Sequence, residues 1–306
     1  MTLPETWRMP PTIVPMNLKG GVGKTAVAEG LAGALHKHTG QPVLMADANT
    51  EGGLTRWATG GPPRRFEKNL GSALLGHHPV LDAIVDLGSP AVEQDQTKVW
   101  RRSQWAGQHL IPTTTWPIRV SHMAMDENSL TFVSLRLLVQ RAMREAAERG
   151  IFYAAAIVDP GHNDTDATLL AMVAGDLIVP VVCARQSQSV DQLDALFTLF
   201  KQARKHEDHR HMNMGGIIVT DHDRREYMPN QVVRAVANAY GVPETPENKN
   251  DLYARTNERF WGVTPHRAAV ERAINSGQTY YTYGNEIEGV PQLFDSIVRD
   301  RILGTR

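Results

Sequence analysis

Residues 19–25 read Lys-Gly-Gly-Val-Gly-Lys-Thr, a set of residue types suited to holding a phosphate chain. They follow a short apolar run at residues 12–14 and precede an alanine-rich stretch, which predicts a strand, a tight turn and a helix start. Such a turn directs backbone N–H groups and the positive end of a helix dipole at one anion. Lys24 can reach the β and γ phosphates, and Thr25 can ligate Mg²⁺. The predicted phosphate-binding residues are Gly20, Gly21, Val22, Gly23, Lys24, Thr25 and Ala26.

Two carboxylates follow apolar runs, where the carboxyl ends of strands are expected. Asp47 comes after residues 43–46, and Asp159 comes after residues 154–158. Together with Thr25 they can bind Mg²⁺, directly or through water, and Asp47 can instead orient an attacking water. A strand-end aspartate that only caps a turn is the alternative for Asp47.

The elements that must position these groups form an alternating pattern. Val- and Ile-rich runs recur between helix-length segments, which is typical of parallel strands buried on both faces. We expect an α/β fold with a doubly wound, mostly parallel sheet and helices on both faces. The expected strands are residues 12–14, 43–46, 109–112, 154–158, 177–182, 216–220 and 259–263, and the main helices are 26–38, 130–149, 190–205 and 229–240.

The chain has 306 residues, of which 42% are hydrophobic and 21% charged, so it can bury a substantial core. We expect one domain over residues 1–306, with an irregular polar insertion at about 56–108 and no helix-turn-helix domain before the phosphate loop. The single cysteine, Cys183, excludes a disulfide within one chain and fits a reducing cytoplasm.

Lys19 makes the phosphate loop unusual, because ordinary loops of this kind do not require a lysine there. The segment resembles the deviant Walker A motif of the ParA/MinD family of P-loop ATPases, in which this lysine crosses a dimer interface to the partner's nucleotide. The resemblance implies ATP and Mg²⁺ as cofactors and an ATP-dependent homodimer. It also implies catalytic roles for Lys19, Lys24 and Asp47.

Asn49 departs from the family pattern. The family segment usually reads Asp-x-Asp-Pro-Gln-Gly-Asn, whereas residues 47–53 read Asp-Ala-Asn-Thr-Glu-Gly-Gly. An amide can orient water but cannot accept a proton as a carboxylate can. We therefore expect the protein to bind ATP. Because Asn49 occupies a catalytic position, we expect ATP hydrolysis to be slow or to depend on a partner.

Residues 216–225 resemble the family's strand and loop that end in Thr-x-x-Asp-x-Arg. In such folds this loop and a later one, here residues 264–267, close around the adenine. The resemblance assigns Thr220, Asp223 and Pro265 to the base. An ordinary strand followed by a charged loop explains the same residues equally well.

The resemblance implies a switch for plasmid or chromosome partition, which binds nonspecific DNA in the ATP state and is released by hydrolysis with a ParB-like partner. With 32 basic and 33 acidic residues, any DNA binding must come from a local patch. Basic side chains in the C-terminal half could line one face of a dimer and bind phosphates without reading bases, although each could equally be solvated surface charge. They are Arg224, Arg225, Arg234, Arg267 and Arg272.

Two alternatives stay open. One is a MinD-like ATPase that positions a protein cargo or a membrane-bound partner, and the other is a nearly non-hydrolysing, nucleotide-locked regulatory dimer. The apolar run at residues 293–303 could resemble a membrane-targeting tail, yet a helix packed on the sheet explains it better. We expect a cytoplasmic, nucleoid-associated protein.

Overall fold

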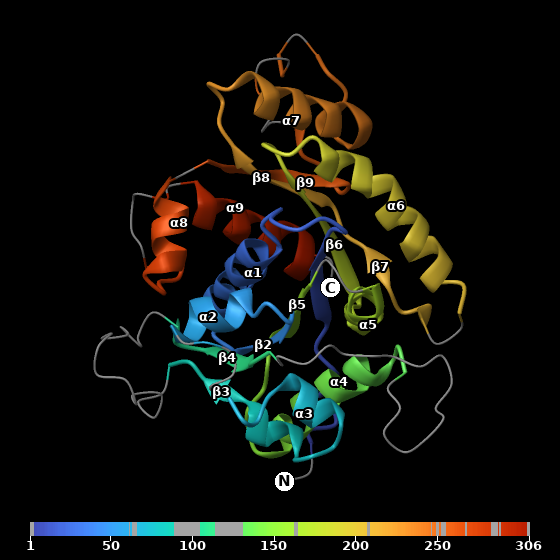
Figure 1. The fold of residues 1–306 in the computed structure, drawn as a ribbon, viewed down its shortest axis with the longest axis vertical. Coiled ribbons are helices and arrows are strands. Elements are labelled where there is room, and N and C mark those ends of the chain that lie inside the picture. The colour runs from blue at the N-terminus through green and yellow to red at the C-terminus, as the bar shows by residue number, and fades with distance from the viewer. Residues whose placement is uncertain are drawn as a thin grey trace.

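A mostly parallel sheet forms the centre of the molecule in the computed structural model (Figure 1). The structure describes residues 3–60, 62, 66–88, 105–113, 131–161, 165–206, 209–245, 247–248, 251, 255–266, 268–282, 287 and 289–304. Within them the strand order is β3-β4-β2-β5-β1-β6-β8-β9, with the short β7 paired to β6. The strands are β1 (Thr12–Met16), β2 (Val43–Ala48), β3 (Val85–Asp86), β4 (Gln108–Ile111), β5 (Ala155–Pro160), β6 (Leu177–Cys183), β7 (Asn213–Met214), β8 (Ile217–His222) and β9 (Phe260–Pro265).

Helices cover both faces of this sheet. On one face lie α1 (Lys24–Thr39), α2 (Gly53–Thr59), α8 (Ala268–Asn275) and α9 (Val290–Ile297), and α9 continues as a π-helical turn at Val298–Leu303. On the other face lie α3 (Leu70–Leu74), α4 (Ser134–Glu148), α5 (Thr165–Ala174), α6 (Gln188–Ala203) and α7 (Tyr227–Tyr240), together with a 3-10 turn at Val80–Ala83. The pairing of β3 with β4 is antiparallel, and the other pairings of the described strands are parallel.

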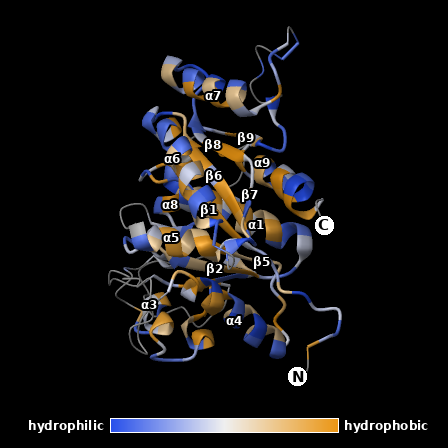
Figure 2. Ribbon diagram, turned by 90° about the vertical axis from the view of Figure 1, so that its right-hand side faces the viewer, coloured by the Kyte–Doolittle hydropathy of each residue, from blue (hydrophilic) through white to orange (hydrophobic). Residues whose placement is uncertain are grey.

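The strands read as nearly continuous apolar runs because both faces of the sheet are buried. Successive side chains of a strand point to opposite faces, so Val181 and Cys183 pack with the α1 and α9 layer, whereas Val182 packs with α6 and α7. Figure 2 shows this as hydrophobic strands enclosed by helices whose outer surfaces are hydrophilic.

Small residues on α1 let α9 and the chain before it approach closely. A Cβ on Gly30 would lie 2.2 Å from the ring of Phe294, and one on Gly33 would lie 2.5 Å from the ring of Tyr281. The two glycines of α1 therefore serve close packing against the C-terminal segment.

The doubly wound, mostly parallel architecture predicted from the sequence is confirmed. β3 and β7 were not expected, because a strand of two residues is too short for a period of two to appear. The described part of residues 56–108 contains the end of α2, then α3, the 3-10 turn and β3. The C-terminal apolar run forms a helix on the sheet, as expected, with Phe294, Ile297 and Val298 buried. Among the helices of the described residues, none is both long and apolar enough to span a bilayer.

Candidate nucleotide site

The glycine-rich loop joins β1 to α1 at the carboxyl edge of the sheet. Gly21 (φ 71°) and Gly23 (φ 90°) both adopt left-handed backbone, which a residue with a Cβ rarely tolerates. A Cβ on Gly23 would also lie 3.1 Å from the hydroxyl oxygen of Thr220. Because α1 begins at Lys24, the positive end of its dipole faces the loop.

Lys24 is buried at the start of α1, where its Nζ donates a hydrogen bond to the backbone carbonyl of Lys19 at 2.9 Å. Burial lowers the pKa of the Lys24 ammonium, while the charges of Asp159 and Glu51 act in the opposite direction. A partly desolvated ammonium held inside the loop is well placed to bind an anion, because an anionic ligand would offset the cost of burying the charge.

Asp47 and Asp159 lie side by side, since they are register partners on β2 and β5. Asp159 Oδ2 accepts a hydrogen bond from Thr25 Oγ1 at 2.7 Å, whereas its buried Oδ1 has no partner. Asp47 Oδ2 accepts from both the backbone N–H and the hydroxyl of Thr55 at 2.7 Å. Burial raises the pKa of both carboxyl groups, and the charge of Asp47 raises that of Asp159 further.

These groups fit Mg²⁺, which favours oxygen ligands and is usually bound by one or two protein groups together with several waters and substrate phosphates. Thr25 Oγ1 and the unpartnered Oδ1 of Asp159 would hold the ion, and its charge would relieve the repulsion between the two carboxylates. Asp47, expected to take part, is already engaged by Thr55 and lies beside this position. Within the described residues, no group of three or more His, Cys, Asp and Glu side chains could form a metal site made of protein alone.

Asn49 shapes the turn after β2. Its backbone N–H donates to Asp47 Oδ1 at 3.1 Å, and its side-chain Oδ1 accepts from the N–H of Glu51 at 3.1 Å. The backbone carbonyl of Asn49 accepts from Thr113 Oγ1 at 2.6 Å. The backbone of Asn49 therefore contacts Asp47, whereas the oxygen of its side-chain amide already accepts a hydrogen bond within the turn.

Lys19 is held by the segment that follows β6. Its N–H donates to Asn17 Oδ1 at 2.8 Å, and its ammonium donates to Gln188 Oε1 at the start of α6. In the same segment, Gln186 Nε2 donates to the Gly21 carbonyl at 3.3 Å. Motif reasoning missed Gln186 and Gln188, because they belong to no motif and reach the loop only through the adjacency of β1 and β6.

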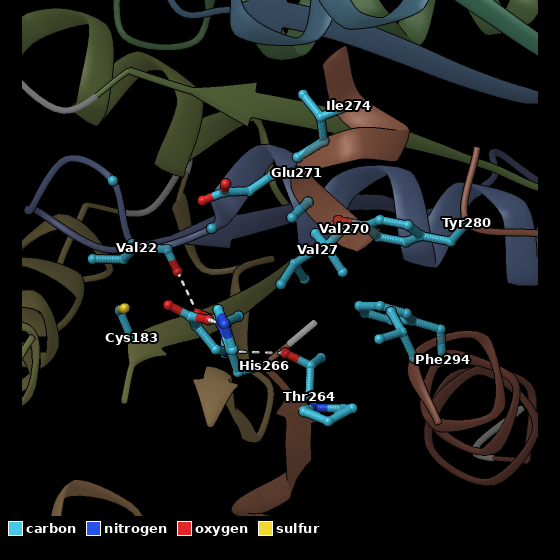
Figure 3. Close-up of a pocket in the computed structure, with 17 residues that line it drawn as sticks. Val22, Val27, Cys183, Thr264, His266, Val270, Glu271, Ile274, Tyr280 and Phe294 are labelled. Atoms are coloured by element: carbon cyan, nitrogen blue, oxygen red, sulfur yellow. Dashed lines mark hydrogen bonds and ion pairs between the residues drawn. The ribbon is translucent and has the colours of Figure 1, made fainter. Parts of the chain in front are cut away.

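A pocket of about 180 Å³ continues from the loop along α1 (Figure 3). Thr220 and Pro265 line it, as expected for the base, whereas Asp223 does not. Asp223 instead accepts hydrogen bonds from the N–H and the guanidinium of Arg225, which lower the pKa of its carboxyl group. Asp221, Thr264 and His266, which belong to the two loops expected around the base, also line the pocket. The lining residues that motif reasoning missed are Val27, Cys183, Val270, Glu271, Ile274, Tyr280, Val290 and Phe294.

The arginines proposed for DNA lie on several elements. Arg224 and Arg225 are exposed in the turn between β8 and α7, Arg234 is half-buried on α7, and Arg272 is exposed on α8. Arg267 lies outside the described residues.

A doubly wound sheet with a phosphate loop after β1 and acids at the ends of β2 and β5 defines a P-loop nucleotide-binding protein. The chain belongs to the CobQ/CobB/MinD/ParA nucleotide-binding domain family, whose model matches residues 13–280. The resemblance drawn from the phosphate loop is thereby confirmed. A comparison with curated protein sequences finds no significant match.

Solved structures agree on the fold. The ATP complex of a Cyanothece McdA variant superimposes with a TM-score of 0.69 at 16% identity, covering 97% of this chain and 98% of that one. A putative plasmid partition protein of Borrelia burgdorferi bound to AMPPNP gives 0.62 at 16%, covering 95% and 99%. MinD of Pyrococcus horikoshii with Mg-ADP gives 0.59 at 16%, covering 97% and 98%. The nucleotides and magnesium in these structures agree with the ATP and Mg²⁺ expected from the sequence.

Proposed function

We propose that this chain is a switch that dimerises when it binds Mg-ATP, with Lys19 of each copy contacting the phosphates held by the other. The observation that carries the proposal is that the loop contains Lys19 in addition to Lys24. Lys24 already supplies the buried ammonium that one phosphate site needs, so Lys19 is surplus to a site built from a single chain. In the single chain Lys19 is bonded to neutral Gln188, a contact that a triphosphate from a second copy would outcompete.

The test is mass in solution with ADP, ATP and a nonhydrolysable ATP analogue. We expect dimers with ATP or the analogue and monomers with ADP. Lys19→Ala should keep its nucleotide affinity and lose the dimer, whereas Lys24→Ala should lose both. A Lys19→Ala protein that still dimerises with ATP would refute the role at the interface.

We propose further that the ATP dimer partitions a plasmid or chromosome locus, binding nonspecific DNA on the nucleoid until hydrolysis, stimulated by a ParB-like partner, releases it. The exposed Arg224, Arg225 and Arg272 support this assignment, as does the fold shared with the Borrelia partition protein. The ATP-loaded protein should bind random duplex DNA with affinity that falls steeply with salt, because each phosphate contact releases counterions. Binding to anionic vesicles and not to duplex would instead favour a MinD-like role.

A second candidate, a nucleotide-locked regulatory dimer, is supported by Asn49. An amide stands where the family usually carries a carboxylate, and its oxygen accepts a hydrogen bond from the N–H of Glu51. Turnover measured on the ATP-bound dimer, with and without DNA, separates the two candidates, since a locked dimer persists long after ATP is added.

A further inference from the structure

Asp221 has an unusual backbone at the end of β8. Its φ is 61°, in the left-handed region that costs free energy for a residue with a Cβ, although aspartate tolerates it better than most. Its N–H donates to Thr264 Oγ1 at 3.2 Å, across the gap between the ends of β8 and β9. Asp221 is one of the residues that line the nucleotide pocket.

The carboxylate of Asp221 is fixed between two side chains. Its Oδ1 accepts a hydrogen bond from His266 Nδ1, and its Oδ2 lies 3.5 Å from Arg185 Nε. The backbone N–H of His266 in turn donates to the carbonyl of His222 at 2.7 Å. Because an ionised carboxylate can only accept, a neutral His266 ring carries its proton on Nδ1 and keeps a lone pair on Nε2.

The nucleoside of a bound nucleotide would occupy this pocket. Its near wall is formed by the phosphate loop and the first turn of α1, so phosphates on the loop direct the sugar and base into it. Val270 and Ile274 of α8 supply apolar walls of the kind that the faces of a purine require (Figure 3).

Other polar groups of the pocket are largely engaged. The hydroxyl of Thr220 donates to the Val22 carbonyl at 2.8 Å, and the hydroxyl of Thr264 accepts from Asp221. Of the pocket's titratable side chains besides Asp221, His266 is held in place by Asp221, Glu271 is exposed on α8, and Cys183 and Tyr280 are buried. The oriented imidazole is therefore the group best able to read one edge of the base.

We propose that His266, oriented by Asp221, makes the site prefer adenine to guanine. The inference rests on the proposed function, because it concerns the nucleotide of that same site. Adenine carries an amino donor at its six position, which His266 Nε2 can accept, whereas guanine carries a carbonyl acceptor there. Two acceptors that face each other each lose a hydrogen bond, and such a loss discriminates strongly between ligands.

The experiment measures binding of three Mg-nucleotides: ATP, GTP and the triphosphate of purine riboside, which lacks the six-amino group. The unmodified protein should bind ATP about tenfold more tightly than purine riboside triphosphate, and GTP more weakly still. His266→Ala should weaken ATP about tenfold and leave purine riboside triphosphate unchanged. His77→Ala, which changes an exposed histidine outside the pocket, is the matched control.

Asp221→Asn distinguishes base recognition from a purely structural role of His266, because it should change the affinities for ATP and GTP in opposite directions. An amide can donate to Nδ1, which lets the ring carry its proton on Nε2 and donate to the guanine carbonyl. GTP affinity should therefore rise in this variant while ATP affinity falls.

The inference is overturned if His266→Ala weakens all three nucleotides equally, or if Glu271→Gln rather than His266→Ala changes the ratio of ATP to GTP affinity. It is also overturned if the unmodified protein binds all three alike, an outcome that leaves the proposed switch intact. If the unmodified protein binds none of them, the proposed function itself fails.

Discussion

The two ends of the nucleotide pocket are built differently. The phosphate end gathers charged and polar side chains from the ends of adjacent strands and the start of α1, namely buried Lys24, Asp47 and Asp159 and half-buried Thr25. The base end is mostly apolar and is assembled from β8, β9, α8 and α9. The difference reflects the ligand, since phosphate needs fixed charges whereas a purine needs a shaped apolar slot with few hydrogen bonds. Substitutions at the two ends should therefore have effects of different size and kind.

The largest effect is expected from Lys24→Ala at the phosphate end. Charge-assisted hydrogen bonds contribute about 3 kcal/mol, so ATP affinity should fall about a hundredfold. Titration calorimetry with Mg-ATP measures it. Lys68→Ala, which removes an exposed lysine paired with Asp82, should leave the affinity unchanged. Equal affinities of the Lys24 variant and the unmodified protein would show that the buried ammonium is not used by phosphate.

Asp159→Asn should weaken the contribution of Mg²⁺ to ATP binding more than the binding of ATP alone. We expect Mg²⁺ to strengthen ATP binding in the unmodified protein, and expect the variant to lose about 2 kcal/mol of that gain. The nucleotide-free variant should be at least as stable as the parent, because the substitution removes one of two adjacent buried carboxylates. Melting curves with ATP, with and without Mg²⁺, test both statements. A variant that responds to Mg²⁺ like its parent would place the ion elsewhere.

The two ends also differ in what sequence alone reveals. The phosphate loop is contiguous, and Asp47 and Asp159 end strands whose apolar runs are unmistakable, so the fold and this end follow from motif and periodicity. At the base end, the pairing of Asp221 with His266 depends on β8 lying beside β9. The phosphate end has one contact of the same kind, that of Lys19 with Gln188, which depends on β6 lying beside β1. These contacts join residues 45 and 169 positions apart, so no local pattern indicates them.

A buried carboxyl group, that of Glu29, lies beside Tyr280 of the base end, and Glu29→Gln tests how its ionisation affects stability. Glu29 is fully buried on α1, its Oε1 has no partner, and its Oε2 lies 3.5 Å from the N–H of Tyr280, a residue of the pocket. Burial raises the pKa of Glu29 from 4.5 to about 8. The folded protein therefore binds an extra proton between these values, and the free energy of unfolding decreases as the pH rises through this window.

Glutamine should remove that pH dependence, because it is never charged and its NH₂ can donate to the unpartnered Oε1 of buried Gln108. We expect a gain of about 1–2 kcal/mol in the free energy of unfolding at pH 9 and little change at pH 5. Denaturant titrations at both pH values measure it, with exposed Glu67→Gln as control. The same pH slope in both proteins would mean that Glu29 ionises freely in the folded state.

The smallest effect is expected from Asn49→Asp, in the turn between β2 and α2. A positioned general base can contribute about 10²–10⁴ in rate. The backbone N–H of residue 49 contacts Asp47, two residues before the new carboxylate. The N–H of Glu51 that now bonds to Asn49 Oδ1 would stabilise the charged carboxylate and weaken it as a base. We therefore expect turnover to rise only about fivefold, below the full contribution of a base. Phosphate release on the ATP-bound dimer measures it, and an unchanged rate in a folded, ATP-binding variant would remove Asn49 as the cause of slow hydrolysis.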